Sequence, residues 1–274
     1  MMSLAYAVAT PDTNDASMLA ARGPLPESFK MLAGLGYSGV DLMLRDPVLL
    51  NAAEIGRMAA DCNLAIVAVS TGQLGKEDGL SLSHADASIR SRSLDRARAV
   101  IEFAATFGAD VNIGGLRGRL GASAQDREAA MGRARTSYAL LAAHAAKARI
   151  QLCLEPQCRY FSDWLPTLAS AAEWNAQFGE GCLAVLADLY HMMLEEESVH
   201  TAFIRELPRI SAIQFSDTNR RAPGMGHWNF DETLRILAAL GYSGGITIEC
   251  QQLPDTRGAA ARAASCILPN VPAC

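Results

Sequence analysis

The stretch LAVLADLYH, residues 183–191, holds the two features that decide the fold, namely an apolar run of strand length and an acidic residue, Asp188, where that run ends. Short apolar runs bounded by polar residues are typical of buried parallel strands. The four runs of this form lie 33, 26 and 35 residues apart, each separation close to one strand–helix unit. Their terminal polar residues are Glu155 in IQLCLEP (150–156), Asp188, Gln214 in ISAIQF (210–215) and Glu249 in GITIEC (245–250).

Apolar runs alternate with helical segments along the chain, and this alternation predicts an α/β fold, a (β/α)8 TIM barrel. Helical spacing is clearest in 88–107, 124–147 and 231–240, and Asp231 is the expected cap of the last of these. With 274 residues, against roughly 250 for a typical barrel, we expect one barrel domain over 1–274. The eight strands are expected near 4–9, 38–44, 64–70, 109–114, 150–155, 184–188, 210–216 and 245–250.

A short repeat supports this arrangement of elements. LGYSG occurs at 35–39 and again at 240–244, each time after a predicted helix and before a predicted strand. Gly36 and Gly241 are therefore expected to end their helices in the left-handed conformation.

Composition excludes several classes of function. Half of the residues are apolar, 19% are charged, and the net charge is −5, so a basic surface for nucleic acid is not expected. No apolar run reaches the ~18 residues of a membrane span, and the first residues do not form a signal peptide. We expect a cytoplasmic protein that acts on a small molecule.

The four terminal polar residues predict a metal site. Active sites of (β/α)8 barrels form where the carboxyl ends of the strands meet. Three carboxylates and an amide oxygen from Glu155, Asp188, Gln214 and Glu249 would converge there, and a hard divalent cation would relieve their repulsion. The neutral oxygen of Gln214 favours Mn²⁺, with Mg²⁺ or Co²⁺ as alternatives, over zinc.

Such a site suits chemistry at a sugar carbonyl. A cation that polarises the carbonyl makes the neighbouring C–H acidic, and Glu155 and Glu249 are placed to remove and return its proton through an enediolate. Return to the same carbon gives epimerisation, return to the next carbon gives an aldose–ketose isomerase, and loss of a leaving group gives a dehydratase or lyase. The pattern leaves these three open.

Three further residues are candidates for contact with the substrate. His191, three residues after Asp188, could bond a substrate oxygen or could pack in its loop. Arg220, in the loop 217–227, could hold a hydroxyl or carboxylate or could lie on the surface, a role for which Arg221 is better suited. Arg117, after the fourth strand, could reach a substrate carboxylate.

At these residues the chain resembles the sugar phosphate isomerase/epimerase group with the xylose-isomerase-like barrel. DGLSL at 78–82 and APGMGH at 222–227 are similar to the 5-keto-L-gluconate epimerase branch, which is related to ketose epimerases of the D-tagatose 3-epimerase type. The resemblance extends from Thr10 to about Pro254. It implies an epimerase of a ketose or keto-uronate sugar that contains one divalent metal ion.

The resemblance also implies roles for individual residues. The metal would bind Glu155, Asp188, residue 214 and Glu249, the two glutamates would double as the acid/base pair, and His191 and Arg220 would hold the substrate near its carbonyl. The third ligand is usually His in the epimerases, whereas Gln, as at Gln214, occurs in hydroxypyruvate isomerases and dehydroshikimate dehydratases. Ketose epimerases usually have a substrate-contacting Glu six residues after the first ligand. Here Phe161 stands at that position, which predicts either a different mode of sugar binding or contact with an apolar part of the substrate.

Two other classes of protein with this barrel fold are alternatives. A phosphodiesterase of the endonuclease IV type needs a cluster of metals rich in His, and two of the five His here, His144 and His200, fall in helical segments. A catalytically decayed sugar-binding barrel would not need all three carboxylates. Relatives are commonly dimers or tetramers, so a homodimer or homotetramer is expected.

Overall fold

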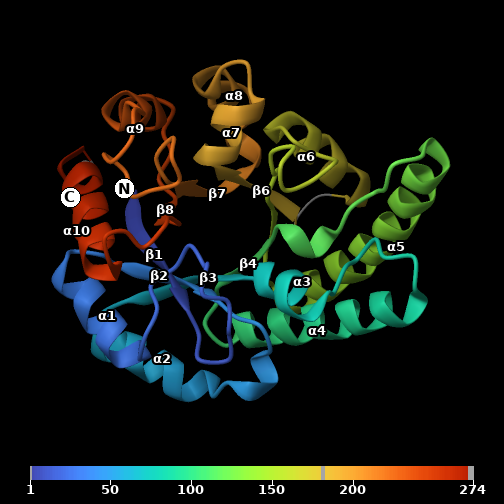
Figure 1. Ribbon diagram of the computed structural model, residues 1–274, viewed down its shortest axis with the longest axis horizontal. Coiled ribbons are helices and arrows are strands. Elements are labelled where there is room, and N and C mark those ends of the chain that lie inside the picture. The colour runs from blue at the N-terminus through green and yellow to red at the C-terminus, as the bar shows by residue number, and fades with distance from the viewer. Residues whose placement is uncertain (1, 180–182, 271–274) are drawn as a thin grey trace.

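The computed structural model describes residues 2–179 and 183–270, and within them eight parallel strands close into a barrel in chain order (Figure 1). The predicted TIM-barrel fold is therefore confirmed. Residues 1, 180–182 and 271–274 of the expected domain lie outside the described part. The strands are β1 (Ser3–Ala9), β2 (Gly39–Met43), β3 (Ala65–Ser70), β4 (Asp110–Ile113), β5 (Leu152–Leu154), β6 (Leu183–Asp188), β7 (Ile210–Phe215) and β8 (Gly245–Ile248).

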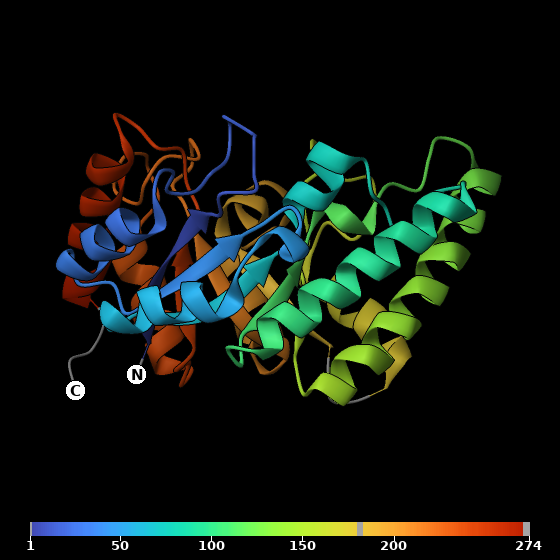
Figure 2. The same ribbon diagram turned by 90° about the horizontal axis from the view of Figure 1, so that it is seen from below.

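Helices surround the barrel, and Figure 1 is a view into its mouth. Helices α4 and α5 lie side by side at the right in Figures 1 and 2. Figure 2 shows the strands ending on the upper side, where α3 and the loops that follow the strands lie. The helices are α1 (Leu25–Gly34), α2 (Ala52–Asp61), α3 (Gly72–Asp78), α4 (Ala87–Ala105), α5 (Ala124–Ala148), α6 (Leu168–Asn175), α7 (Leu189–Glu195), α8 (Val199–Glu206), α9 (Phe230–Ala239) and α10 (Thr256–Ile267). Short 3-10 turns are η1 (Pro47–Leu49), η2 (Gly115–Arg117), η3 (Ala176–Phe178), η4 (Leu207–Arg209) and η5 (Leu268–Asn270).

Alternate strand residues face the helices and the barrel interior. In β2, Val40 and Leu42 belong to the large apolar core outside the barrel, and Met43 belongs to a separate small cluster with alanines of β1. Because side chains alternate along a strand, Asp41 faces inward with Met43. The interior is thus lined by small and polar side chains and the outer layer by large apolar ones.

Strand register brings the predicted residues to one level. Asp188 is paired with Gln214 across β6 and β7, and Gln214 with Thr247 across β7 and β8. Glu249 follows β8 directly and Glu155 follows β5, where its N–H continues the ladder to the carbonyl of Ile113 at 3.0 Å. The four residues therefore lie at the same end of the barrel.

Several predictions on local structure can be compared with the structure directly. The two LGYSG copies end their helices alike, with Gly36 at φ +89° and Gly241 at φ +78°. The predicted cap of α9 is wrong, because Asn229 rather than Asp231 accepts the hydrogen bond from the N–H of Glu232. None of the described helices is both long and apolar enough to cross a membrane.

Candidate active site

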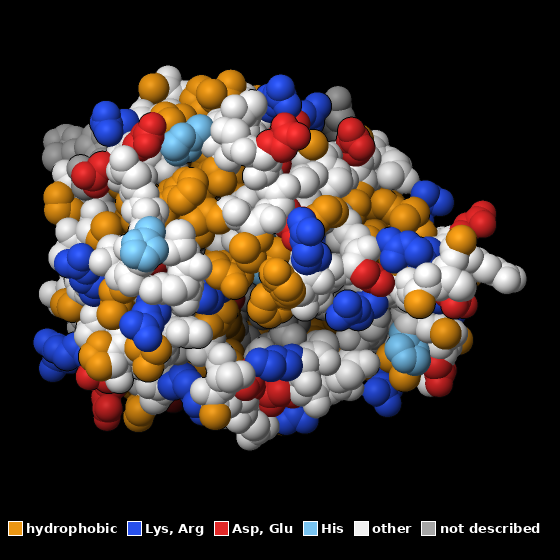
Figure 3. All heavy atoms as spheres, turned by 45° about the horizontal axis from the view of Figure 1, so that its top comes forward, with side chains coloured by type: hydrophobic (Ala, Val, Ile, Leu, Met, Phe, Trp, Pro, Cys, Tyr) orange, Lys and Arg blue, Asp and Glu red, His pale blue; other side chains and the backbone are white. Residues whose placement is uncertain are grey.

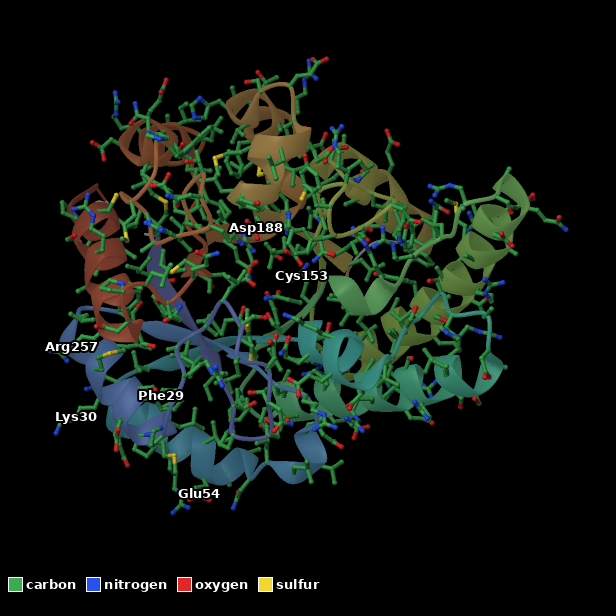
Figure 4. All side chains as sticks on the ribbon, viewed as in Figure 1. Phe29, Lys30, Glu54, Cys153, Asp188 and Arg257 are labelled. Carbon is green, nitrogen blue, oxygen red and sulfur yellow. The ribbon has the colours of Figure 1, made fainter. Side chains whose placement is uncertain are left out.

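A cavity of about 1070 Å³ opens at the barrel mouth, and the predicted residues Glu155, Gln214, Arg220 and Glu249 line it. This volume is slightly above the range of about 300–1,000 Å³ that is usual for small-molecule sites. Figure 3 shows a hollow near the centre of this face, bordered by hydrophobic and basic side chains. Figure 4 places Asp188 near the centre of the mouth, whereas Lys30, Glu54 and Arg257 lie on the outer helices.

Glu155, Asp188 and His191 form the most compact group of candidate metal ligands, with one ligand atom from each within 4.8 Å of the others. His191 Nε2 lies 3.4 Å from Glu155 Oε1 and 3.8 Å from Asp188 Oδ2. Asp188 ends β6 and caps α7 by accepting a hydrogen bond from Tyr190 N–H, which places His191 on the first turn of the same helix. The backbone N–H of Cys158 donates to His191 Nδ1, so the other ring nitrogen faces the two acids.

The surroundings of His191 act on its pKa in opposite directions. Burial lowers the pKa, and the neighbouring carboxylates of Asp188 and Glu155 raise it above the usual value, to about 10. The hydrogen bond that Nδ1 accepts from Cys158 opposes the doubly protonated form, because an imidazolium ion has no acceptor. A cation near Nε2 would take the place of the proton there.

Arg220 is held between two of the predicted metal ligands. Its Nη1 donates to both carboxylate oxygens of Asp188 at 2.8 and 2.7 Å, and its Nη2 donates to Glu249 Oε2 at 3.2 Å. The guanidinium also stacks over the ring of Tyr190, 4.7 Å from the ring centre. Arg220 is thus a buried component of the acidic site and not a surface residue.

The loop after β7 fixes Arg220 in this position. Buried Asp217 accepts hydrogen bonds from the backbone N–H groups of Thr218, Gly224 and Trp228. Arg220 itself adopts φ +60°, a conformation that non-glycine residues rarely hold without surrounding support. The role of Asp217 was not predicted, because nothing in its local sequence shows how the loop folds back on it.

The charges of the cluster support the binding of a divalent cation. When all three carboxylates, of Glu155, Asp188 and Glu249, are ionised and His191 is neutral, they outweigh the single guanidinium by two negative charges. Burial and the neighbouring carboxylates raise the pKa of Glu249 to about 8, even though Arg220 acts to lower it. For Asp188, burial acts to raise the pKa, but Arg220 and His191 outweigh it and the pKa is lowered. The oxygen donors among these residues, the carboxylates and the amide of Gln214, suit Mn²⁺, Mg²⁺ or Co²⁺.

Close packing also positions Glu155. A Cβ atom added at Gly114 would lie 2.2 Å from Glu155 Oε2, so only glycine leaves room for this carboxylate. The same oxygen accepts a hydrogen bond from Gln157 at 2.9 Å.

Phe161 and Arg117 are placed differently. Phe161 is 57% exposed, lines the cavity and contacts the His191 ring edge-on at 5.3 Å, a position compatible with the predicted apolar contact. Arg117 does not line the cavity: its buried side chain donates to the carbonyl oxygens of Glu155 and Trp164. This placement does not support the predicted contact of Arg117 with a substrate carboxylate, because turn η2 directs the side chain toward the backbone beneath the site.

Gln214 leads to a polar network that was not predicted. Its Nε2 donates to Asp41 Oδ2 at 3.4 Å, and Asp41 also accepts from Ser70 Oγ and Asn112 Nδ2, each at 2.9 Å. Asp41 is fully buried, and burial raises its pKa to about 6 against the lowering effect of these hydrogen bonds. Asn112 Oδ1 is buried without a hydrogen-bond partner among the described residues. The network joins β2, β3 and β4 to β7 across the barrel.

Comparison with known proteins places the chain among barrels of this kind. The family model described as xylose isomerase-like TIM barrel matches residues 29–267. The chain belongs to this family. It is also a distant homologue of ketose 3-epimerases: L-ribulose 3-epimerase of Mesorhizobium japonicum is 24% identical over 237 residues, 85% of this chain and 77% of that protein.

Other relatives are also sugar epimerases by name. Ketose 3-epimerase of Arthrobacter globiformis is 21% identical over 78% of this chain and 73% of its own length. D-psicose 3-epimerase of Agrobacterium fabrum is 29% identical over 100 residues, which are only 36% of this chain and 35% of that protein. Among solved structures, 3-keto-D-glucoside 4-epimerase from E. coli superposes with a TM-score of 0.81 at 19% identity, covering 97% of this chain and 98% of that one. At that identity the superposition shows the shared fold.

Proposed function

We propose that this protein is a divalent-metal-dependent epimerase of a ketose or keto-uronate sugar. The observation that supports the proposal most is the convergence of Glu155, Asp188 and His191, since Glu155 and His191 line the same cavity as Glu249. Homology to sugar epimerases agrees with it. In this proposal Glu155, Asp188, Gln214 and Glu249 are the metal ligands, and Mn²⁺ is the favoured ion.

The proposed reaction assigns a proton to each glutamate in turn. When bound, the cation would draw electrons from the sugar carbonyl and make the adjacent C–H acidic. Glu155 and Glu249 come from β5 and β8, with β6 and β7 between them, so they approach the substrate from different sides. One carboxylate removes the proton and the other returns one to the opposite face of the same carbon. The raised pKa of Glu249 suits a group that must exist in both protonation states near neutral pH.

Arg220 and His191 would hold the reacting end of the sugar. Arg220 keeps Asp188 and Glu249 in fixed positions and carries the positive charge that stabilises a developing oxyanion. His191 presents Nε2 to the same region because Cys158 fixes its ring. Phe161 would cover the edge of this region with an apolar surface.

Two arginines in the cavity lining favour a keto-uronate over a neutral ketose as the substrate. Arg119 and Arg133 line the cavity, and among residues 2–179 and 183–270 no carboxylate oxygen lies within 4.0 Å of either guanidinium. Arg133 Nε donates to the carbonyl of Ser83, which leaves its two terminal nitrogens for a ligand. Two unpaired guanidinium groups in an acidic protein suit the carboxylate of a uronate. R119A/R133A should raise KM for a keto-uronate and leave KM for a neutral ketose unchanged.

The direct test is a product analysis. Purified protein with Mn²⁺, Mg²⁺ or Co²⁺ would be incubated in D₂O with ketohexoses, keto-uronates and 3-keto-glycosides, and products would be identified by NMR. Inversion at one carbon with uptake of one deuterium supports the epimerase. An aldose product would favour the isomerase, an unsaturated product the dehydratase, and the absence of both metal binding and turnover a decayed sugar-binding barrel.

A further inference from the structure

Asp41 is a buried carboxylate with no basic partner. It is fully buried in β2, and no Lys, Arg or His nitrogen among the described residues lies within 4.0 Å of it. A buried, unpaired charge is costly unless hydrogen bonds compensate it. Every hydrogen bond that Asp41 makes through its side chain is one it accepts, from Ser70, Asn112 and Gln214. A neutral Asn could fill the same space without the free-energy cost of burying a charge. The presence of a carboxylate at this position therefore points to a role for the charge.

The hydrogen bond to Gln214 decides which end of an amide faces the cavity. An amide has a donating NH₂ end and an accepting oxygen end, and only the oxygen can bind a hard cation. An ionised carboxylate only accepts hydrogen bonds, so the NH₂ group of Gln214 must face Asp41. The oxygen of the same amide is then the end left for the cavity that Gln214 lines.

Asp41 is itself held firmly enough to impose this orientation. Ser70 Oγ lies 2.9 Å from both of its carboxylate oxygens, and Asn112 Nδ2 bonds Asp41 and Ser70 at 2.9 and 3.0 Å. These partners come from β3, which is next to β2, and from β4, the following strand, so the carboxylate is anchored on one side of the barrel and reaches Gln214 on the other.

We propose that Asp41 is a positioning residue that fixes the Gln214 amide with its oxygen toward a divalent cation held by Glu155 and Asp188. The proposal rests on the proposed function, since it takes Gln214 as a metal ligand. Carboxylates that hold metal-binding side chains in place typically contribute 10- to 100-fold to metal affinity. Asp41 acts through Gln214 and contacts neither the metal nor the substrate.

The test compares Asp41 with a second aspartate on a barrel strand. Asp110 in β4 is partly buried and contacts Cys153, away from Gln214. Mn²⁺ affinity would be measured by EPR titration of the full-length protein. D41N is expected to bind Mn²⁺ about 10- to 100-fold more weakly than wild type, and D110N to bind it equally well. Equal affinity of D41N and wild type would overturn the proposal.

A double-mutant cycle separates positioning from a general structural effect. In Q214A there is no amide to orient, so adding D41N should cause no further loss of Mn²⁺ affinity. The same fold-loss in both backgrounds would contradict the positioning role. Q214H should retain sensitivity to D41N, because a His ring can donate one N–H to Asp41 and bind the cation with its other nitrogen.

The Mn²⁺ titration also distinguishes a failure of the proposed function from a failure of this inference alone. Wild-type protein that binds no Mn²⁺, Mg²⁺ or Co²⁺ would overturn both the proposed function and this inference, whereas tight binding by both wild type and D41N overturns only the inference. Thermal unfolding without metal shows whether D41N folds. If D41N does not fold, S70A, which removes one hydrogen bond to Asp41 and no group that contacts Gln214, should weaken Mn²⁺ binding, and unchanged binding contradicts the proposal.

Discussion

The two halves of the barrel mouth both contain buried acidic side chains, but the partners of these side chains differ. The half from β5 to β8 gathers three carboxylates, a guanidinium and an imidazole, and its acids are paired with Arg220 or lie close to His191. The half from β2 to β4 contributes the buried carboxylate of Asp41, whose hydrogen bonds come only from neutral donors. Gln214 belongs to the first half by its strand and to the second by its hydrogen bond.

We therefore assign the proposed chemistry to the charged half and the orientation of Gln214 to the neutral half. The charged half has a surplus of negative charge that can bind a cation and exchange a proton with a substrate. The oxygens of Asp41 in the neutral network already accept hydrogen bonds, so we assign this network no part in the proposed proton transfer, but it fixes the direction of one amide. The two halves should therefore respond differently to the same kind of substitution, and the following predictions test that difference in order of decreasing effect.

The largest effect is expected from the acid/base pair of the charged half. E249Q keeps the size of the side chain and an oxygen ligand but cannot take up a proton, so turnover should fall by about 10³-fold, within the usual range for a general acid or base. E155Q should reduce turnover to a similar extent as E249Q. Turnover is measured with the substrate found in the NMR panel, and E173Q on the exposed face of α6 is the control. Wild-type rates in E249Q would remove Glu249 from the proposed role.

Loss of the guanidinium should destabilise the charged half. R220A leaves Asp188 and Glu249 buried without their partner, and removal of one member of a buried ion pair typically costs about 3–5 kcal/mol. The free energy of unfolding in urea, measured with EDTA, should fall by that order in R220A and hardly change in the exposed neighbour R221A. Saturating Mn²⁺ should restore part of the loss. Equal stabilities of R220A and R221A would contradict the pairing.

The neutral half should show a pH-dependent cost of burial. The folded-state pKa of Asp41 is raised from 3.8 to about 6, so its burial costs nothing below about pH 4, the cost grows between about pH 4 and pH 6, and it levels off above that. The cost reaches about 3 kcal/mol at pH 7. Without metal, the stability of D41N relative to wild type should therefore increase from pH 4 to pH 7. Urea unfolding curves that run parallel over this range would show that Asp41 does not titrate as expected.

The smallest effect on turnover is expected from a steric clash with the Glu155 carboxylate. G114A adds a methyl group 2.2 Å from Glu155 Oε2 and must move the carboxylate, whereas a Cβ added at the neighbouring Gly115 meets no atom within 4 Å. A displacement of about 1 Å typically reduces turnover by about 10²-fold. G115A is therefore the matched control for an assay of turnover, and equal rates in the two variants would rule out the steric argument.

The sequence predicted which residues lie together at one end of the barrel where a residue ended an apolar run. Glu155, Asp188 and Glu249 were found that way, and the register of the parallel strands brings them together. Asp41 was missed because it lies within the short strand GVDLM, where sequence alone does not show how deep in the barrel it is. The pairing of Arg220 depends on how the loop 217–227 folds around Asp217, and the burial of Arg117 depends on turn η2. Contacts made by loops were thus not readable from local pattern.

The measurement that tests the central claim most directly is solvent exchange with and without metal. Protein stripped with a chelator would be mixed with its substrate in D₂O, and deuterium at the carbon next to the carbonyl would be followed by NMR while Mn²⁺ is added. The account predicts no exchange without a cation and exchange that rises with Mn²⁺ until one site is filled. Exchange at the full rate in the stripped protein, or no binding of any divalent cation, would contradict it.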